Sequence, residues 1–205
     1  MAYSNFTIDS LKRKFKLTIN EESDYFAAAE AIEISPRLAE TLAESVPLAL
    51  SISTEKARSE MIRAPLLIEL RRLLHHQISL FSGIEFNVDK EQDLHGVCDF
   101  LISLSAEQLA VSAPVITLVE AKNENIKAGL SQCIAEMLAA RLFNQQQDNN
   151  ISTIYGVVTT GSNWKFLRLH GDTVYLDQTE YYIKEAGKIV GILLKMIQGV
   201  KAEKG

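Results

Sequence analysis

The chain has 205 residues and a formal net charge of −5 at pH 7, and 47% of its residues are hydrophobic. A chain of this size and composition makes one domain with a sizeable core. It has no run of about 18 apolar residues that could span a membrane, and its first residues lack the apolar segment of a signal peptide. We therefore expect a soluble, cytoplasmic protein.

The charge is unevenly distributed along the chain. Residues 21–60 carry nine acidic and three basic residues, whereas residues 120–170 carry four and five. Nucleic-acid-binding proteins usually have a basic surface, so the net charge weighs weakly against such a partner. Because most of the acidity lies outside residues 120–170, the charge does not exclude one. The two cysteines, Cys98 and Cys133, lack metal-type spacing and do not predict a disulfide framework.

Helical patterns dominate the first part of the chain. Pro36 and Pro47 are expected to divide residues 21–50 into short helices that wrap the core. A longer helical pattern runs over residues 54–79, where apolar residues recur at helical spacing. Pro65 lies inside this pattern and should either kink the helix or mark a short first turn before a new one.

Strands and one long helix are predicted next. Gly83 is expected to end the helical region and to precede a strand at residues 84–88, where apolar and polar residues alternate. Two more strands are expected at residues 97–103 and 115–121. A helix then follows over residues 125–143, with apolar residues along one of its faces.

The last third of the chain predicts further strands and a final helix. The expected order is a polar loop at 145–150, strands at 151–160, 164–169 and 173–176, and a helix over 180–198. The succession of helix, three strands, helix and more strands is typical of a mixed α/β protein with one sheet.

The strand at residues 115–121 ends unusually. Side-chain alternation should place Ile116, Leu118, Glu120 and Lys122 on one face, so an apolar strand ends with a carboxylate beside an ammonium. If Asp99 on the neighbouring strand points to the same place, the three groups could hold a divalent cation and activate a water. Alternatively, Glu120 and Lys122 emerge into solvent and pair there. A Glu-x-Lys triplet occurs about once by chance in such a chain.

The features around this strand have a recognisable order, namely a helix with a glutamate, a strand with Asp99, a strand ending in Glu120-Ala121-Lys122, and a helix with Gln132. This order resembles the PD-(D/E)XK nuclease superfamily, also called the restriction-endonuclease-like fold. The resemblance covers roughly residues 50–170 and looks closest to small, uncharacterised cyanobacterial-type members.

The resemblance implies an α/β domain with a restriction-endonuclease-like core. Its mixed central sheet would be flanked by helices in the order α-β-β-β-α-β. We expect a single domain over residues 1–205, with an N-terminal helical extension at 1–50, the core at 51–178, and a C-terminal helix and tail at 179–205.

Catalytic roles also follow from the resemblance. Asp99 and Glu120 would bind Mg²⁺ or Mn²⁺ through carboxylate oxygens, with the backbone carbonyl of Ala121 as a third ligand. Lys122 would orient the attacking water and stabilise charge that develops on the phosphate. Gln132 would support the site or contact the substrate backbone.

The first core helix should contribute one acidic residue, and Glu60 is the chosen candidate, with Glu55 and Glu69 as rivals. The chain departs from the superfamily pattern in two places. Cys98 stands where the motif has its proline, and Glu136 stands where many nucleases of the exonuclease branch have tyrosine.

Taken together, the residues and the resemblance imply a Mg²⁺-dependent nuclease that hydrolyses phosphodiester bonds of DNA. An inactive restriction-like fold that serves as a binding or scaffolding module is the alternative. RNA or a nucleotide as the substrate also stays open. The expected partner is nucleic acid rather than a membrane. A homodimer is compatible with this chemistry, since two copies of one site commonly cut two strands.

Overall fold

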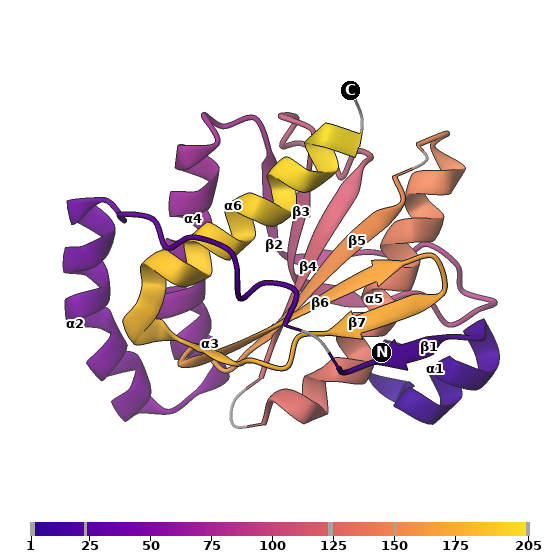
Figure 1. Cartoon of the computed structure of the whole chain (residues 1–205), viewed down its shortest axis with the longest axis horizontal. Coiled ribbons are helices and arrows are strands. Elements are labelled where there is room, and N and C mark those ends of the chain that lie inside the picture. Colours follow the sequence, from indigo (N-terminus) through magenta and orange to yellow (C-terminus); the bar gives the residue numbers. More distant parts are fainter. Residues whose placement is uncertain (1–2, 23, 123–124, 150, 204–205) are drawn as a thin grey trace.

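The computed structural model describes residues 3–22, 24–122, 125–149 and 151–203. These residues form an α/β protein in which helices cover both faces of one mixed sheet (Figure 1). This architecture confirms the fold class in its general form. In the same part of the chain, no helix is both long and apolar enough to cross a bilayer.

The sheet of the described residues has eight strands. Their bounds are β1 Thr18–Asn20, β2 Ser79–Glu85, β3 Val97–Ser103, β4 Val115–Ala121, β5 Thr153–Thr159, β6 Asn163–His170, β7 Thr173–Leu176 and β8 Tyr181–Tyr182. They lie in the order β1-β7-β6-β5-β4-β3-β2, and β8 pairs with β6. The pairs β4/β5 and β1/β7 are parallel and the others antiparallel. Strand β4 therefore lies inside the sheet, between β3 and β5.

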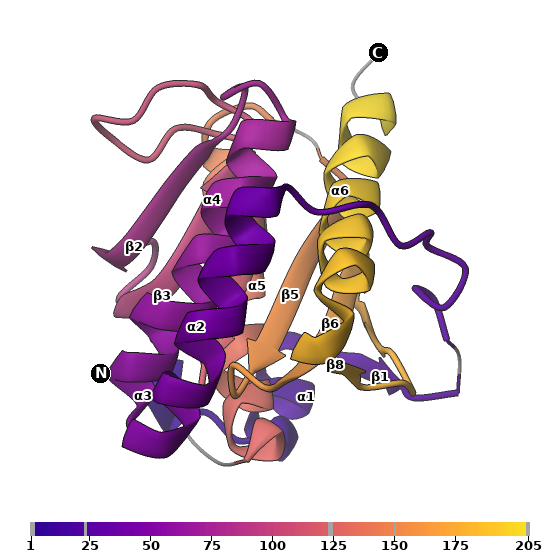
Figure 2. The same ribbon diagram turned by 90° about the vertical axis from the view of Figure 1, so that its left-hand side faces the viewer.

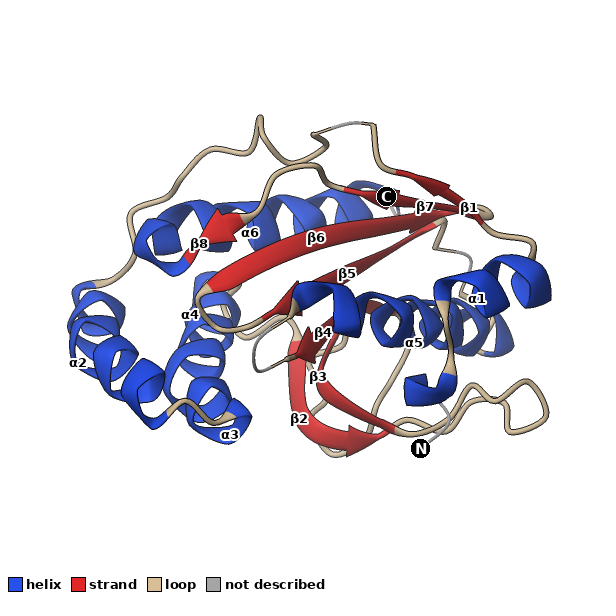
Figure 3. Ribbon diagram, turned by 90° about the horizontal axis from the view of Figure 1, so that it is seen from below, coloured by secondary structure: helices blue, strands red, loops and turns tan. Residues whose placement is uncertain are grey.

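The helices divide between the two faces. Their bounds are η1 Tyr3–Asn5, α1 Ile8–Phe15, α2 Pro36–Ile52, α3 Glu55–Arg58, the π-helical turn η2 Ser59–Arg63, α4 Ala64–Leu73, α5 Ile126–Gln146, η3 Ile183–Glu185 and α6 Ala186–Glu203. One core lies between the sheet and α2, α4 and α6, and the other lies between the sheet and α1 and α5. Figures 2 and 3 show this division, with α6 and α5 on opposite sides of the central strands.

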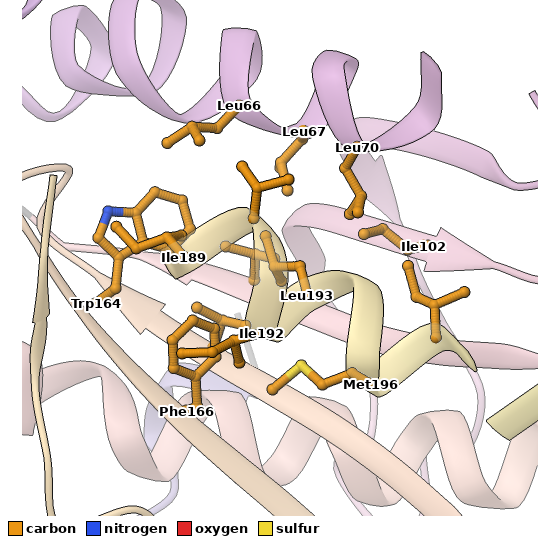
Figure 4. Close-up of a cluster of buried hydrophobic side chains, with 14 of the residues drawn as sticks. Leu66, Leu67, Leu70, Ile102, Trp164, Phe166, Ile189, Ile192, Leu193 and Met196 are labelled. Atoms are coloured by element: carbon orange, nitrogen blue, oxygen red, sulfur yellow. The ribbon is translucent and has the colours of Figure 1, made fainter. Parts of the chain in front are cut away.

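The core under α4 and α6 is built from large apolar side chains. Figure 4 shows that Leu66, Leu67 and Leu70 of α4 face the inner side of α6, with Trp164 and Phe166 of β6 beneath. All five are at most 2% exposed. Because burying a large apolar side chain contributes about 1.5–3 kcal/mol, this contact fixes α4 on the sheet.

The expected short helices of residues 21–50 are wrong. Residues 36–52 form the single helix α2, which begins with Pro36 in its first turn and contains Pro47 in its interior. Proline at the first helical position removes an N–H that has no partner anyway. Leu38 and Ala49, on either side of Pro47, are both buried in the core, so packing outweighs the local cost of the proline.

The segment at 54–79 contains one helix with an irregular turn, because the backbone stays right-handed helical from Glu55 to Leu73. Thr54 caps α3, the π-helical turn η2 follows, and α4 then has Pro65 in its first turn. Of the two expected outcomes, a new helix starting at Pro65 is therefore wrong, because Arg63 and Ala64 keep helical backbone angles. The predicted start of the next strand is wrong, because β2 begins at Ser79 and includes Gly83 at φ +61°.

The other boundaries differ more modestly. Helix α5 extends to Gln146, into the predicted polar loop, and the part of that loop at residue 150 lies outside the described residues. The final helix begins at Ala186 rather than near 180, because β8 precedes it.

A β-bulge in β4 changes which side chains share a face. Ile102 pairs with Thr117 and Ser103 pairs with Val115, so Ile116 is the extra residue. Ile116 packs in the core under α4 and α6, whereas Val115 packs in the core under α5. Glu120 lies on the α5 side, because it bonds to a side chain of that helix. The prediction that Ile116 shares a face with Glu120 is therefore wrong, and the side chain of Leu118 lies outside what the structure describes.

Helix α5 is fastened to the first residue of β4 by Asn144, which is 1% exposed. The N–H of Val115 donates to Asn144 Oδ1 at 2.8 Å, and Asn144 Nδ2 donates to the carbonyl of Val115 at 2.7 Å. The side-chain amide thus replaces a strand partner for both backbone groups of Val115.

Candidate active site

The predicted site residues come from three elements that meet near the end of β4 (Figure 3). Glu120 is the penultimate residue of β4, Lys122 follows the strand, and Gln132 lies on α5. Asp99 lies on β3, next to Phe100, which pairs with Val119. The next register position lies opposite Glu120, and residues in such positions share a face of the sheet.

Glu120, Lys122 and Gln132 form one hydrogen-bonded network. Gln132 Nε2 donates to Glu120 Oε2 at 2.8 Å, and Lys122 Nζ donates to Gln132 Oε1 at 3.3 Å. Lys122 Nζ also forms an ion pair with Glu120 Oε1. Glu120 is 1% exposed, so the pair differs from the solvent-exposed strand end that was the alternative.

Burial shapes the protonation of this network. Burial, and then the charge of Asp99, raises the pKa of Glu120 to about 7. For Lys122, burial alone would lower the pKa, but the hydrogen bond and charge of Glu120 and the charges of Glu55 and Asp99 outweigh it and raise the pKa. At neutral pH the lysine is therefore a cation beside a carboxyl group that can exchange its proton.

Glu136 extends the network into the core. It lies one helical turn after Gln132, is fully buried, and its Oε1 accepts a hydrogen bond from Gln132 Nε2 at 3.1 Å. Burial raises the pKa of Glu136 well above its ordinary value, and the charge of Glu120 raises it further. We therefore expect this side chain to be a neutral acid at pH 7.

Gly129 lets α5 approach the strands closely. A Cβ atom at this position would lie 2.7 Å from Cγ1 of Val158, 3.0 Å from Cγ of Lys122 and 3.3 Å from Cγ of Glu120. A larger residue would push the helix away from the network. Sequence reasoning missed this position, although a glycine inside a strong helical pattern is a known sign of close packing.

Arg63 joins the site to the first core helices and was also missed from the sequence. Its guanidinium is fully buried, and Nη2 donates to the carbonyls of Lys122 at 2.8 Å and Thr159 at 3.3 Å. Nη1 donates to the carbonyl of Glu55 at 3.2 Å. Burial lowers the pKa of Arg63 to about 10, so it remains charged at neutral pH. The signal in the sequence was one arginine within an apolar stretch.

Two of the three candidate glutamates of the first helix lie near Asp99. Glu55, Glu60 and Asp99 line one cavity of about 250 Å³ with Lys56 and Ser59. Glu60 is exposed and forms a 3.8 Å ion pair with Lys56. The charge of Glu55, by contrast, acts on Lys122 and Arg63. The electrostatics thus favour Glu55 over Glu60 as the acidic neighbour of the network.

Glu69, the third candidate, stabilises the contact between α2 and α4 instead. It forms a 2.7 Å ion pair with Arg72 and accepts hydrogen bonds from the N–H and the hydroxyl of Ser35, each at 3.0 Å. Ser35 caps α2, so Glu69 ties the start of α2 to α4. The hydrogen bond from Arg72 lowers the pKa of Glu69 and keeps it ionised.

A second cavity of about 450 Å³ lies beside the start of α5. Its cationic lining residues are Arg58 and Lys127, and Glu180 supplies one negative charge. Arg58 Nη1 donates to the carbonyl of Thr160 at 3.3 Å. Helix α3 therefore contributes residues to both cavities, with Glu55 in one and Arg58 in the other.

A divalent cation at this site would need oxygen donors from the protein. In the described part of the chain, no three or more His, Cys, Asp and Glu side chains are grouped so that they could hold a metal ion together. Mg²⁺ is often held by one or two carboxylates and keeps several waters, which Asp99 and Glu120 can satisfy. Ala121, the proposed backbone ligand, is the last residue of β4 and pairs with Thr159. The oxygen donors that the site offers are thus two carboxylates and a backbone carbonyl, and both oxygens of Glu120 contact Gln132 or Lys122 in this structure.

Comparison with known proteins identifies no relative, since no family model, no curated protein and no solved structure matches the chain. The interpretation of the site therefore depends on its own residues.

Proposed function

We propose that the protein is a nuclease that hydrolyses phosphodiester bonds of DNA with Mg²⁺ or Mn²⁺, on a restriction-endonuclease-like fold. The observation that carries the proposal is the buried network of Glu120, Lys122 and Gln132 at the end of an internal strand, with the charge of Asp99 acting on Glu120. The succession α4-β2-β3-β4-α5-β5 supports the choice of fold.

Each residue has a role in this proposal. Asp99 and Glu120 hold the cation, with the backbone carbonyl of Ala121 as a further oxygen donor. When bound, such a cation lowers the pKa of a water and neutralises charge on the phosphate. Lys122 orients the attacking water and stabilises negative charge on the phosphate oxygens. Gln132 keeps Lys122 and Glu120 in register through its amide.

In the proposed reaction, Lys122 exchanges its contacts within the protein for a contact with the substrate phosphate. In the structure its ammonium contacts Glu120 and Gln132. Lys122 is partly exposed, with 24% of its side chain accessible, whereas Glu120 is enclosed. The ammonium can therefore turn toward a substrate phosphate while Glu120 stays fixed by Gln132.

Nucleic acid as the substrate is supported by the second cavity. Arg58 and Lys127 line it beside the start of α5, close to where Lys122 leaves β4. Most protein–DNA hydrogen bonds go to phosphates and sugars, and cationic side chains outside the reacting centre supply this affinity. A strand whose scissile phosphate lies at Lys122 would place a neighbouring phosphate near these two residues.

The test is a cleavage assay with matched variants. Purified protein with Mg²⁺ or Mn²⁺ is incubated with linear duplex, nicked duplex and single-stranded DNA, and with RNA. We expect cleavage that EDTA abolishes and that falls at least about a hundredfold in Lys122→Ala and Asp99→Ala. Lys195→Ala, an exposed lysine on α6, serves as the control. Cleavage that is absent, or unchanged in both site variants, would refute the proposal, and cleavage of RNA alone would change the substrate.

A scaffolding or binding module is the competing function, and one observation favours it. The ion pair between Lys122 and Glu120 neutralises the strand end without any other group. Calorimetric titration with Mn²⁺ separates the two, because a scaffold should not bind the cation. Binding that disappears in Glu120→Gln would support the nuclease.

A further inference from the structure

Glu136 is the one buried acid of the network to which the proposed reaction gives no role. It is fully buried on α5, and its carboxyl group lies within hydrogen-bond reach of that of Glu120 as well as of Gln132. The polar groups around it are engaged elsewhere, since the Tyr3 hydroxyl donates to the carbonyl of Phe86 at 2.6 Å. Cys133 Sγ lies 3.8 Å from the carbonyl of Val157, to which it donates. A carboxyl group in these surroundings costs folding stability, so packing does not account for it.

The hydrogen bonds of Gln132 explain what the carboxyl group does. Nε2 of Gln132 donates to Glu120 and Glu136, while its Oε1 accepts from Lys122. A side-chain amide has one donor end and one acceptor end. In the flipped orientation, its oxygen would face both acids and its N–H groups would face the ammonium. In the observed orientation, Oε1 of Glu136 is a second acceptor beside Glu120, so one amide serves Glu120, Glu136 and Lys122 together.

The spacing of Gln132 and Glu136 along α5 places their side chains next to each other. Glu136 follows Gln132 by four residues, and such residues are neighbours on one helix face. Both side chains are carried by α5, which Gly129 brings against β4 and β5. The orienting contact thus moves with the helix and does not depend on a loop.

We propose that Glu136 is a positioning residue, which acts through Gln132 to hold Glu120 and Lys122 in the arrangement that binds the cation and the phosphate. This inference rests on the proposed nuclease function. It gives a role to a residue that departs from the superfamily pattern, where many nucleases have tyrosine.

The test uses two substitutions that separate positioning from packing. Glu136→Met keeps the length of the side chain and removes the acceptor, whereas Glu136→Gln keeps a carbonyl oxygen that can accept from Gln132. In Glu136→Met we expect an unchanged or higher melting temperature and an Mn²⁺ affinity that is about 10- to 100-fold weaker, as for other residues that orient metal ligands. Glu136→Gln should bind Mn²⁺ close to the wild type.

Two further measurements make the test specific. In the protein without added metal, the NMR signals of the Gln132 side-chain amide should move in Glu136→Met and much less in Glu136→Gln. In the Gln132→Met background, Glu136→Met should weaken Mn²⁺ binding much less than in the wild type, because only the direct contact with Glu120 is then left to lose.

The outcomes distinguish this inference from the function beneath it. A wild-type protein that neither binds Mn²⁺ nor cleaves nucleic acid would overturn both. An active wild type whose Glu136→Met variant binds Mn²⁺ equally well would overturn the positioning role alone. Loss of folding in Glu136→Met with normal folding of Glu136→Gln would also overturn it, since the role would then be structural.

Discussion

The buried carboxyl of Glu120 makes the stability of the protein depend on pH in a defined direction. Its pKa is about 7 in the folded protein, against an ordinary value of 4.5. Between these values the folded protein holds a proton at Glu120 that the unfolded chain has released. The free energy of unfolding therefore falls as pH rises from about 4.5 to about 7. At about 1.36 kcal/mol for each pH unit, the loss is about 3 kcal/mol.

Glu120→Gln removes this titration and should flatten the profile. The free energy of unfolding of the wild type minus that of the variant should fall by about 3 kcal/mol between about pH 5 and pH 8. Glu136 keeps the part of its contribution that comes from burial, the first cause of its raised pKa, and loses the part that comes from the charge of Glu120. The slope that remains in the variant is thus assigned to other groups.

Urea unfolding at several pH values measures the difference. The chain has one tryptophan, Trp164, which is fully buried, so its fluorescence reports loss of the core. Glu60→Gln, at an exposed site, is the control and should keep the wild-type profile. If the difference between wild type and Glu120→Gln stays constant within about 1 kcal/mol from pH 5 to pH 8, the burial argument for Glu120 is wrong.

Three further predictions concern the surroundings of the site. Gly129→Ala should lower the free energy of unfolding by about 1–3 kcal/mol through overpacking, whereas Gly199→Ala, whose Cβ would meet only Tyr155 Oη at 3.5 Å, should be neutral or stabilising in the same denaturation assay. Arg63→Met removes three hydrogen bonds of a charged group and should lower the free energy of unfolding by at least about 3 kcal/mol. Thermal unfolding would measure this, and an unchanged melting temperature would show that these hydrogen bonds do not stabilise the fold. Lys127→Ala should weaken DNA binding and reduce the slope of log affinity against log salt by about one, while Lys195→Ala should leave that slope unchanged.

Regular elements were predictable where local pattern and packing agree. The bounds of β3, β4 and β7 match the predicted strands, because runs of apolar and β-branched residues are bordered by turn residues. Helix α5 begins after Asn125, whose side chain caps it as the predicted start at that residue requires. Failures occurred where tertiary contacts override local preference, as at Pro47 inside α2 and at Gly83 inside β2.

The candidate site was predictable only in part. Asp99 and Glu120 belong to neighbouring strands and Lys122 directly follows β4, so alternation and adjacency suggest their proximity. Glu136 and Arg63 have no such strand pattern, because their importance comes from contacts with Glu120, Lys122 and Thr159 that depend on how α5 and η2 pack on the sheet. The bulge at Ile116 is equally invisible in the pattern, since it requires knowledge of the partner strand.

That bulge also decides which faces of the sheet the two ends of β4 point to. In a regular strand with no bulge, Val115 and Glu120 would point to opposite faces, because five steps along a strand reverse the direction of a side chain. With it, both ends of β4 face α5, and α5 holds each end with a side-chain amide, Asn144 at one and Gln132 at the other. Asn144 and Gln132 are twelve residues apart on α5, which is about 18 Å along the helix axis. Because one rigid helix carries both amides, a shift of α5 along β4 would disturb the contact of Asn144 with Val115 and that of Gln132 with Glu120 together.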